Sequence, residues 1–276
     1  MKKILFPTDF SETSDNAFVH ALELAKTLHA ELVLLHTFDL PIVDSQVFPE
    51  YYLDIFNSLE LSQFEHFKDK IPALRKIAAE RNLEHITMTH LLMDGDLLYN
   101  IKKAVKKENI DFVVMGTKGA SGWYEIFIGT NTSSVIAEVS IPILCVPLEA
   151  KFEKIETIAF TTRFRKKDID ALEKVLLIAK KLKAKVKCLY VKTASSDVTS
   201  ETIKRWESHF EEEPIQIFVI PDDNVKQTIK DFLDNQSIDV LAMLTYKRNF
   251  FEEFFKPSLT QILSYQLEIP ILALHD

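Results

Sequence analysis

The amino-acid sequence contains the same pattern twice, and this duplication constrains the fold more than any other feature. Residues 4–10 (ILFPTDF) match residues 158–164 (IAFTTRF) at an offset of 154 positions. Residues 25–30 match residues 179–184 at the same offset. Because a repeat that keeps its internal spacing indicates one structural unit present twice, we expect two copies of a single domain.

The later part of each copy also repeats, at a smaller offset. Residues 110–115 match 238–243, and residues 141–144 match 269–272, both at an offset of 128 positions. The offset falls by 26 residues, so the first copy carries about 26 extra residues, which we place within 40–70. This insertion is aromatic and acidic, and we expect its aromatic side chains to pack on the domain or on a partner, with a ligand lid as the alternative.

The chain of 276 residues has room for two domains of ordinary size, which we place at 1–150 and 151–276. Within each copy, short apolar runs alternate with longer amphipathic segments. In the first copy the apolar runs are 4–6, 32–36, 85–91, 112–115 and 143–146. Strands that alternate with helices form right-handed crossovers and a parallel sheet. The sequence therefore predicts an α/β fold with two tandem, doubly wound, Rossmann-like parallel-sheet domains.

A helix is expected directly after the first apolar run. Apolar residues recur at helical spacing between Thr13 and His29, and Ser11 or Thr13 can serve as the N-cap. Asp9 then lies between the end of a strand and the start of a helix. A carboxylate at this place can accept a hydrogen bond from a ligand amine or hydroxyl, or it can act only as the charge partner of the helix N-terminus.

All five glycines lie in the first copy, and four of them follow the expected strand at 112–115. We interpret Gly95 and Gly122 as turn residues. The other three, Gly116, Gly119 and Gly129, form the pattern Gly-x2-Gly-x9-Gly-Thr. The pattern continues through Thr130, Asn131 and Thr132 into an expected helix at 133–138. The pattern is neither a P-loop nor a Rossmann dinucleotide fingerprint.

Ligands of open α/β sheets bind beyond the carboxyl ends of the strands, and glycine there lets the backbone approach a phosphate. The N-terminus of a helix attracts anions, and the hydroxyl groups near it add donors. The glycine pattern therefore predicts a loop that holds phosphates without a basic residue. Bound Mg²⁺ would ease the repulsion between a polyanion and the acidic first copy.

Composition excludes several classes of function. Residues 1–150 hold 13 Lys and Arg against 21 Asp and Glu, and residues 151–276 hold 20 of each, so neither half has the basic surplus of a nucleic-acid-binding protein. No apolar stretch reaches the ~18 residues needed to cross a bilayer, and no signal peptide is visible, so we expect a cytoplasmic protein. Without zinc-ligand spacing or a nucleophile elbow, we expect no metal ligands, no catalytic residues and no dedicated enzyme.

Taken together, three segments resemble the universal stress protein (UspA-type) family, and the resemblance covers nearly the whole chain as two tandem domains. The segments are the opening ILFPTDFS, the loop from Met115 and Gly116 through Gly119 to Gly129 and Thr130, and the closing IPILCVP. The resemblance implies a protein of the stress response that binds ATP, or AMP or ADP. It also implies that the closing strands at 141–146 and 269–274 associate, face to face, as in a dimer.

Residue by residue, the resemblance implies three contact regions for an adenine nucleotide. Pro7, Thr8 and Asp9 would meet the adenosine end, and Met115 and Gly116 would lie beside the ribose. The phosphates would meet the remaining residues of the pattern: Gly119, Gly129, Thr130, Asn131 and Thr132.

The second copy departs from this pattern at five equivalent positions. Asp9 is replaced by Arg163, Gly116 by Leu244, Gly119 by Lys247, Gly129 by Pro257 and Thr130 by Ser258. Side chains then stand where the backbone should approach phosphate, and proline removes an N–H donor. We expect the first copy alone to hold the nucleotide, with a different anion site at Arg163, Lys247 and Arg248 as an alternative for the second.

The function expected is therefore that of a regulatory nucleotide-binding protein with protein partners that the sequence does not identify. A scaffold that works without nucleotide is one alternative, and a slow ATPase is another. A further homodimer, beyond the pairing of the two copies, is also left open.

Overall fold

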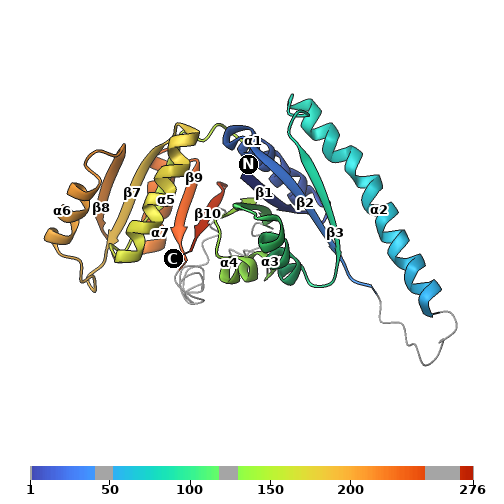
Figure 1. Ribbon diagram of the computed structural model, residues 1–276. Coiled ribbons are helices and arrows are strands. Elements are labelled where there is room, and N and C mark those ends of the chain that lie inside the picture. The colour runs from blue at the N-terminus through green and yellow to red at the C-terminus, as the bar shows by residue number, and fades with distance from the viewer. Residues whose placement is uncertain (1, 41–51, 118–129, 246–267, 276) are drawn as a thin grey trace. The chain divides into compact units, whose positions relative to one another are not determined.

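The computed structural model describes residues 2–40, 52–117, 130–245 and 268–275 of the chain. Strands and helices alternate along both copies, which confirms the expected α/β fold (Figure 1). By its contacts the chain divides into two compact units, Met1–Gly116 and Thr117–Asp276. The division predicted from the repeat, at residue 150, thus differs from the division by contacts, and it stays a prediction.

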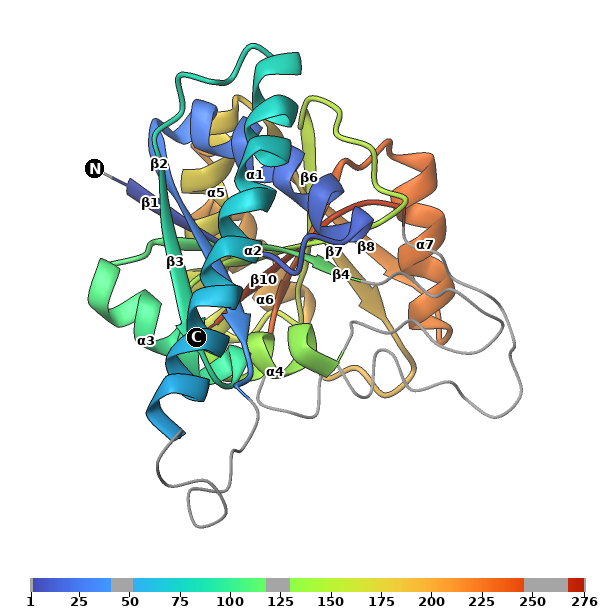
Figure 2. The same ribbon diagram turned by 90° about the vertical axis from the view of Figure 1, so that its right-hand side faces the viewer.

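The first unit contains a parallel sheet with strand order β3-β2-β1-β4. Because β1, β2 and β3 follow one another in one direction, right-handed crossovers place α1 and α2 on one face of the sheet, and α3 returns over the other face (Figure 2). Its elements are β1 (Lys2–Pro7), α1 (Glu12–Leu28), β2 (Ala30–Phe38), α2 (Tyr52–Glu80), β3 (Met88–Asp94), α3 (Leu97–Glu108) and β4 (Phe112–Thr117).

Capping residues explain where α1 begins and ends. The Ser11 side chain accepts a hydrogen bond from the backbone N–H of Ser14, so Ser11 is the N-cap, one of the two residues that the sequence offered. His29 ends the helix in the left-handed conformation, with φ of 51°. Between these caps, Ala17, Ala21 and Leu24 belong to a buried face that packs on the strands.

The third strand begins later than the sequence predicted. We expected a strand at 85–91, whereas β3 covers Met88–Asp94. The preceding residues form turns instead: Asn82 has φ of 56°, and the Ile86 N–H donates to the Leu83 carbonyl at 3.1 Å. The Ile86 N–H is therefore used in a turn and is not available to pair with β2, so β3 does not extend back to residue 85.

The second unit repeats the architecture and contains the last strand of the first copy. Its strand order is β5-β10-β9-β6-β7-β8, in which β10 pairs with β5 antiparallel and the neighbours from β10 to β8 are parallel. Its elements are α4 (Thr130–Glu138), β5 (Ile143–Pro147), β6 (Thr157–Thr161), α5 (Lys166–Leu182), β7 (Lys185–Lys192), α6 (Ser200–His209), β8 (Ile215–Pro221), α7 (Val225–Asn235), β9 (Val240–Leu244) and β10 (Ile271–Leu274).

The pairing of the two closing strands is confirmed. Ile271 is opposite Cys145, Leu272 opposite Leu144 and Ala273 opposite Ile143. These strands associate edge to edge through their backbones, and not face to face as we had expected. Residues 143–147, which form the last strand of the first copy, therefore belong by their contacts to the second unit.

The insertion of the first copy lengthens one helix. Helix α2 has 29 residues, whereas its counterpart α6 has 10. Residues 41–51 of the insertion lie outside the described residues. The expected packing of aromatic side chains on the domain holds for Phe67, which is buried, but Phe64 is 49% exposed on the same helix.

Candidate functional site

The candidate site of the first unit lies where the strand order reverses. Strand β1 pairs with β2 on one side and with β4 on the other, with Leu5 opposite Val113. The carboxyl ends of β1 and β4 therefore lie side by side, and they bring Pro7, Thr8 and Asp9 near Met115 and Gly116. Crevices at such a reversal are where open α/β sheets bind ligands.

Thr8 fixes the loop that follows β1. Its backbone N–H donates to the Leu35 carbonyl at 2.9 Å, and its hydroxyl oxygen accepts from the Phe10 N–H at 3.0 Å and lies 2.7 Å from Ser14 Oγ. The His36 Nδ1–H donates to the Thr8 carbonyl at 2.8 Å, since a carbonyl can only accept. Phe10 can then adopt a left-handed backbone, with φ of 59°.

Asp9 presents the exposed side chain of this loop. Its Oδ1 accepts hydrogen bonds from the Ser11 backbone N–H at 3.0 Å and from the Ser11 hydroxyl at 2.6 Å. Both contacts use one oxygen, so Oδ2 can accept from a ligand amine or hydroxyl. Burial and, after it, the negative charge of Asp9 raise the pKa of Asp15.

Gly116 has a structural reason to be glycine. A Cβ at this position would lie 2.8 Å from the backbone carbonyl oxygen of Thr13, in the first turn of α1. The start of α1 therefore approaches β4 too closely for any side chain. Pro7 and Met115 are buried, so their side chains are not available to a ligand.

The residues expected at the phosphates lie either outside the described residues or in helix α4. Gly119 and Gly129 lie outside the described residues. Helix α4 begins at Thr130, three residues before the expected start at Ser133, so Thr130, Asn131 and Thr132 form its first turn. These three residues belong to the second compact unit, where Thr132 is buried.

The second copy builds the same loop with different charges. The Thr162 N–H donates to the Leu189 carbonyl at 3.0 Å, and the Thr162 hydroxyl accepts from the Phe164 N–H at 2.8 Å, as Thr8 does in the first copy. Phe164 also has a left-handed backbone, with φ of 56°. Arg163 occupies the place of Asp9, and Leu244 ends β9 as a buried side chain. Lys247, Arg248, Pro257 and Ser258 lie outside the described residues.

An aromatic cluster beneath each of these loops was missed in our sequence reasoning. In the first unit the Phe67 ring of α2 stacks on His36, with centroids 5.9 Å apart, and also contacts Phe10. In the second unit the Trp206 ring of α6 packs on Phe164 at 4.9 Å, and Phe164 packs on Tyr190. Part of each cluster is visible in the repeat, because the offset of 154 aligns Phe10 with Phe164 and His36 with Tyr190.

Two further observations concern metals and membranes. Within the ranges that the structure describes, no three His, Cys, Asp or Glu side chains come together as a metal site. None of the helices in those ranges is long and apolar enough to span a bilayer.

Comparison with known proteins gives the family. The model of the universal stress protein family matches residues 1–147. A universal stress protein of Methanocaldococcus jannaschii is 32% identical over 160 residues, which cover 52% of this chain and 94% of that protein. A solved universal stress protein of Archaeoglobus fulgidus covers 99% of this chain and 98% of its own, with a TM-score of 0.70 at 18% identity, so it supports the fold alone. This chain belongs to the universal stress protein family.

Proposed function

We propose that this protein binds one adenine nucleotide through its first copy, and that occupancy regulates how it docks with partner proteins in the stress response. The observation that carries the proposal is the position of Asp9. Its exposed carboxylate stands at the carboxyl end of β1, where the strand order reverses, on a loop held by Thr8. A fixed acceptor at this place suits an adenine amine or a ribose hydroxyl.

The role proposed for each residue is the one that the family resemblance implies. Asp9 would accept a hydrogen bond from the adenosine end, while the backbones of Pro7, Thr8, Met115 and Gly116 would line it. Gly119, Gly129, Thr130, Asn131 and Thr132 would meet the phosphates. ATP, ADP and AMP are candidates, and bound Mg²⁺ would ease the repulsion between the phosphates and the acidic first copy.

Calorimetric titration of the full chain with ATP, ADP, AMP and GTP, each with and without Mg²⁺, tests this proposal. We expect saturation near one adenine nucleotide per chain and weaker binding of GTP. Asp9→Ala should weaken binding about tenfold or more, because it removes a charged acceptor worth ~1.5–3 kcal/mol. Arg163→Gln, at the matching position of the second copy, should leave the affinity unchanged.

A second pair of variants tests the glycine loop in the same way. Gly119→Val puts a branched side chain where the backbone would approach phosphate, and a loss of ~2.7 kcal/mol weakens binding about a hundredfold. Lys247→Val is its counterpart in the second copy and should bind like the parent. Two equivalent sites per chain would overturn the proposal. If no nucleotide binds, and the purified protein carries no adenine absorbance, the proposal fails and the alternative of a scaffold that works without nucleotide stands.

A further inference from the structure

Helix α2 exposes two large apolar side chains that the proposed function does not use. Leu61 is 60% exposed and Phe64 is 49% exposed, and they lie one turn apart on the helix. Elsewhere α2 packs on the first unit, where Phe67 and Leu74 are buried and Phe67 contacts His90 of β3 (Figure 1). One face of the helix is therefore used within the unit, and Leu61 and Phe64 belong to another.

These two side chains belong to one exposed stripe, which we call the outer stripe. Residues that alternate three and four positions apart lie along one side of a helix, and this is the spacing by which helices pair in coiled coils. The position of this series between residues 68 and 75 is Ile71, which is half-buried. The outer stripe spans about 30 Å of helix. It consists of six exposed residues: Asp54, Asn57, Leu61, Phe64, Lys68 and Arg75.

The charge of α2 changes sign along its length. Residues 52–67 hold three Asp or Glu and no Lys or Arg, whereas residues 68–80 hold four Lys or Arg against two Asp or Glu. The helix dipole does not account for this distribution, because its effect is confined to the first and last turns and the last turn of α2 has no basic residue. The outer stripe is thus acidic at one end, with Asp54, apolar in the middle, and basic at the other end, with Lys68 and Arg75.

We propose that two molecules of this protein associate through their outer stripes, with the two α2 helices antiparallel. A twofold axis between Leu61 and Phe64 brings Leu61 of each molecule against Phe64 of the other. The same arrangement places Asp54 of each molecule between Lys68 and Arg75 of the other. A parallel pair would instead bring Asp54 to Asp54 and Lys68 to Lys68, so repulsion selects the antiparallel pair.

Lys68 has a partner on its own helix, but this contact leaves it available to a second molecule. Its Nζ lies 3.3 Å from Glu65 Oε2, and the two side chains are 63% and 52% exposed. Exposed ion pairs of this kind contribute little, so Lys68 can exchange Glu65 for Asp54 of the other molecule at small cost.

The position of the outer stripe limits the assembly to two molecules. Helix α6, the counterpart of α2 in the second copy, has 10 residues and is too short to carry such a stripe, whereas α2 has 29. A contact between identical surfaces about a twofold axis closes at the dimer. With one helix from each molecule and one apolar layer, the interface is small, so the dimer is weak and dissociates on dilution.

Sedimentation equilibrium of the full chain over a series of concentrations tests this proposal. We expect a monomer–dimer equilibrium with no larger species. Leu61→Asp should raise the dissociation constant about tenfold or more, because it puts a charge from each molecule into the apolar layer. Leu177→Asp is the matched control, since Leu177 of α5 is 65% exposed and lies outside the outer stripe, and it should dimerise like the parent.

An exchange of charges tests the antiparallel arrangement. Asp54→Lys in one variant, and Lys68→Glu with Arg75→Glu in another, each bring like charges together, so each variant alone should associate more weakly than the parent. An equimolar mixture of the two should associate like the parent, because both ends of the mixed dimer again pair opposite charges. Circular dichroism checks that the variants keep their helices. The proposal is overturned if the parent is monomeric at every concentration, if Leu61→Asp dimerises like the parent, or if the mixture associates no better than the separate variants.

Discussion

Among single residues, Gly116 shows that a glycine in a ligand-type pattern can have a packing role of its own. The nearest atom to an added Cβ is the carbonyl oxygen of Thr13, which belongs to the backbone of α1 and cannot rotate away. Gly116→Ala should therefore lower the free energy of unfolding by about 1–3 kcal/mol, as overpacking does. Urea denaturation measures this loss.

A second variant checks the cause of that loss. Since the closest contact is backbone, combining Gly116→Ala with Thr13→Ala should not restore the stability of the parent. Full recovery in the double variant would assign the crowding to the Thr13 methyl group, which lies 3.0 Å away. Parent-like stability of Gly116→Ala alone would show that α1 shifts at little cost.

His90 on β3 links the stability of the first unit to pH. Its Nε2 is buried, with no hydrogen-bond partner among the described residues, and burial together with the charge of Arg75 lowers its pKa. The unfolded chain, with a His pKa of ~6.5, then binds the proton more readily than the folded chain. The free energy of unfolding should have its full value above pH ~6.5, the pKa of His in the unfolded chain. It should fall as the pH drops toward the lower pKa that His90 has in the folded chain.

Urea titrations at pH 7.5 and pH 5.5 measure the effect of His90. His90→Phe should reduce the loss of stability between the two pH values, because it removes a group that must protonate on unfolding. His85→Gln is the control, since His85 is exposed three residues before β3. An unchanged pH dependence in His90→Phe would exclude His90 as the linked group.

At the scale of elements, one aromatic ring attaches the long helix α2 to the candidate site. Phe67 contacts Phe10, His36 and His90, and it is 5% exposed. Phe67→Ala should destabilise the protein by about 3–5 kcal/mol and speed hydrogen exchange within α2. Phe64→Ala, one turn earlier on the exposed side, should change stability by less than about 0.5 kcal/mol. Equal effects of the two variants would contradict this attachment.

The sequence predicted the order of helices and strands well, because both copies contain the same alternation of apolar runs and amphipathic segments. The change of offset within the repeat indicated the insertion, and the family resemblance implied the pairing of the closing strands. It could not reveal the aromatic attachment, since neither the offset of 154 nor that of 128 aligns Phe67 with Trp206. Helices α2 and α6 differ in length, and Phe67 and Trp206 lie at positions of these helices that the repeat does not align. The equivalence of the two rings is therefore visible only in the folded structure.

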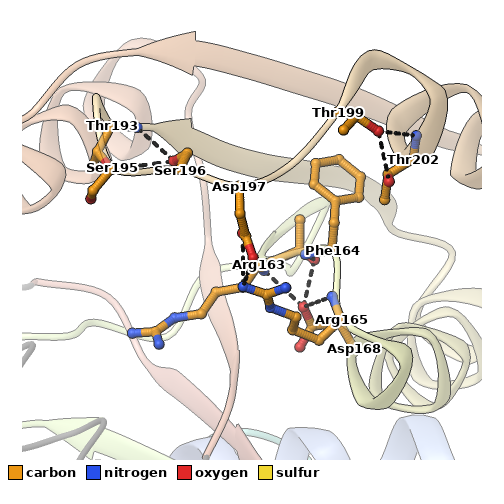
Figure 3. A network of polar contacts seen from close by, with 11 residues as sticks. Arg163, Phe164, Arg165, Asp168, Thr193, Ser195, Ser196, Asp197, Thr199 and Thr202 are labelled. Carbon is orange, nitrogen blue, oxygen red and sulfur yellow. Dashed lines mark hydrogen bonds and ion pairs between the residues drawn. The ribbon is translucent and has the colours of Figure 1, made fainter.

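The candidate site was predicted only in part, for a related reason. Asp9 was identified because its place between a strand and a helix follows from local patterns. The contact between Gly116 and Thr13 depends on how closely α1 approaches β4, which no local pattern determines. The loop around Arg163 likewise depends on Asp168 of α5, whose carboxylate accepts hydrogen bonds from the Thr162 hydroxyl and the Arg163 N–H (Figure 3).

In the whole molecule, the two copies build the same loop after their first strand with residues of opposite charge. The loop after the first strand of each copy has the same hydrogen bonds at the backbone, through Thr8 and Thr162. The residue that follows differs in charge, with Asp9 in one copy and Arg163 in the other. Because the loop is fixed by its threonine and not by this residue, the charge can change without loss of the fold.

The antiparallel pair of β5 and β10 sets the smallest part of the chain that should fold as a unit. A fragment of residues 151–276 lacks β5, so Ile271, Leu272 and Ala273 lose their partner strand and present an unpaired, apolar edge. Such edges pair with other chains. Sedimentation equilibrium should therefore show concentration-dependent association of the fragment 151–276, whereas the full chain, in which β5 covers this edge, should associate less. Amide exchange should be slow in β10 of the full chain and faster in β10 of the fragment. If the fragment stays monomeric with equally protected amides in β10, the edge is covered by some other means, and the division of the chain at residue 150 describes its folding better than the division at residue 116.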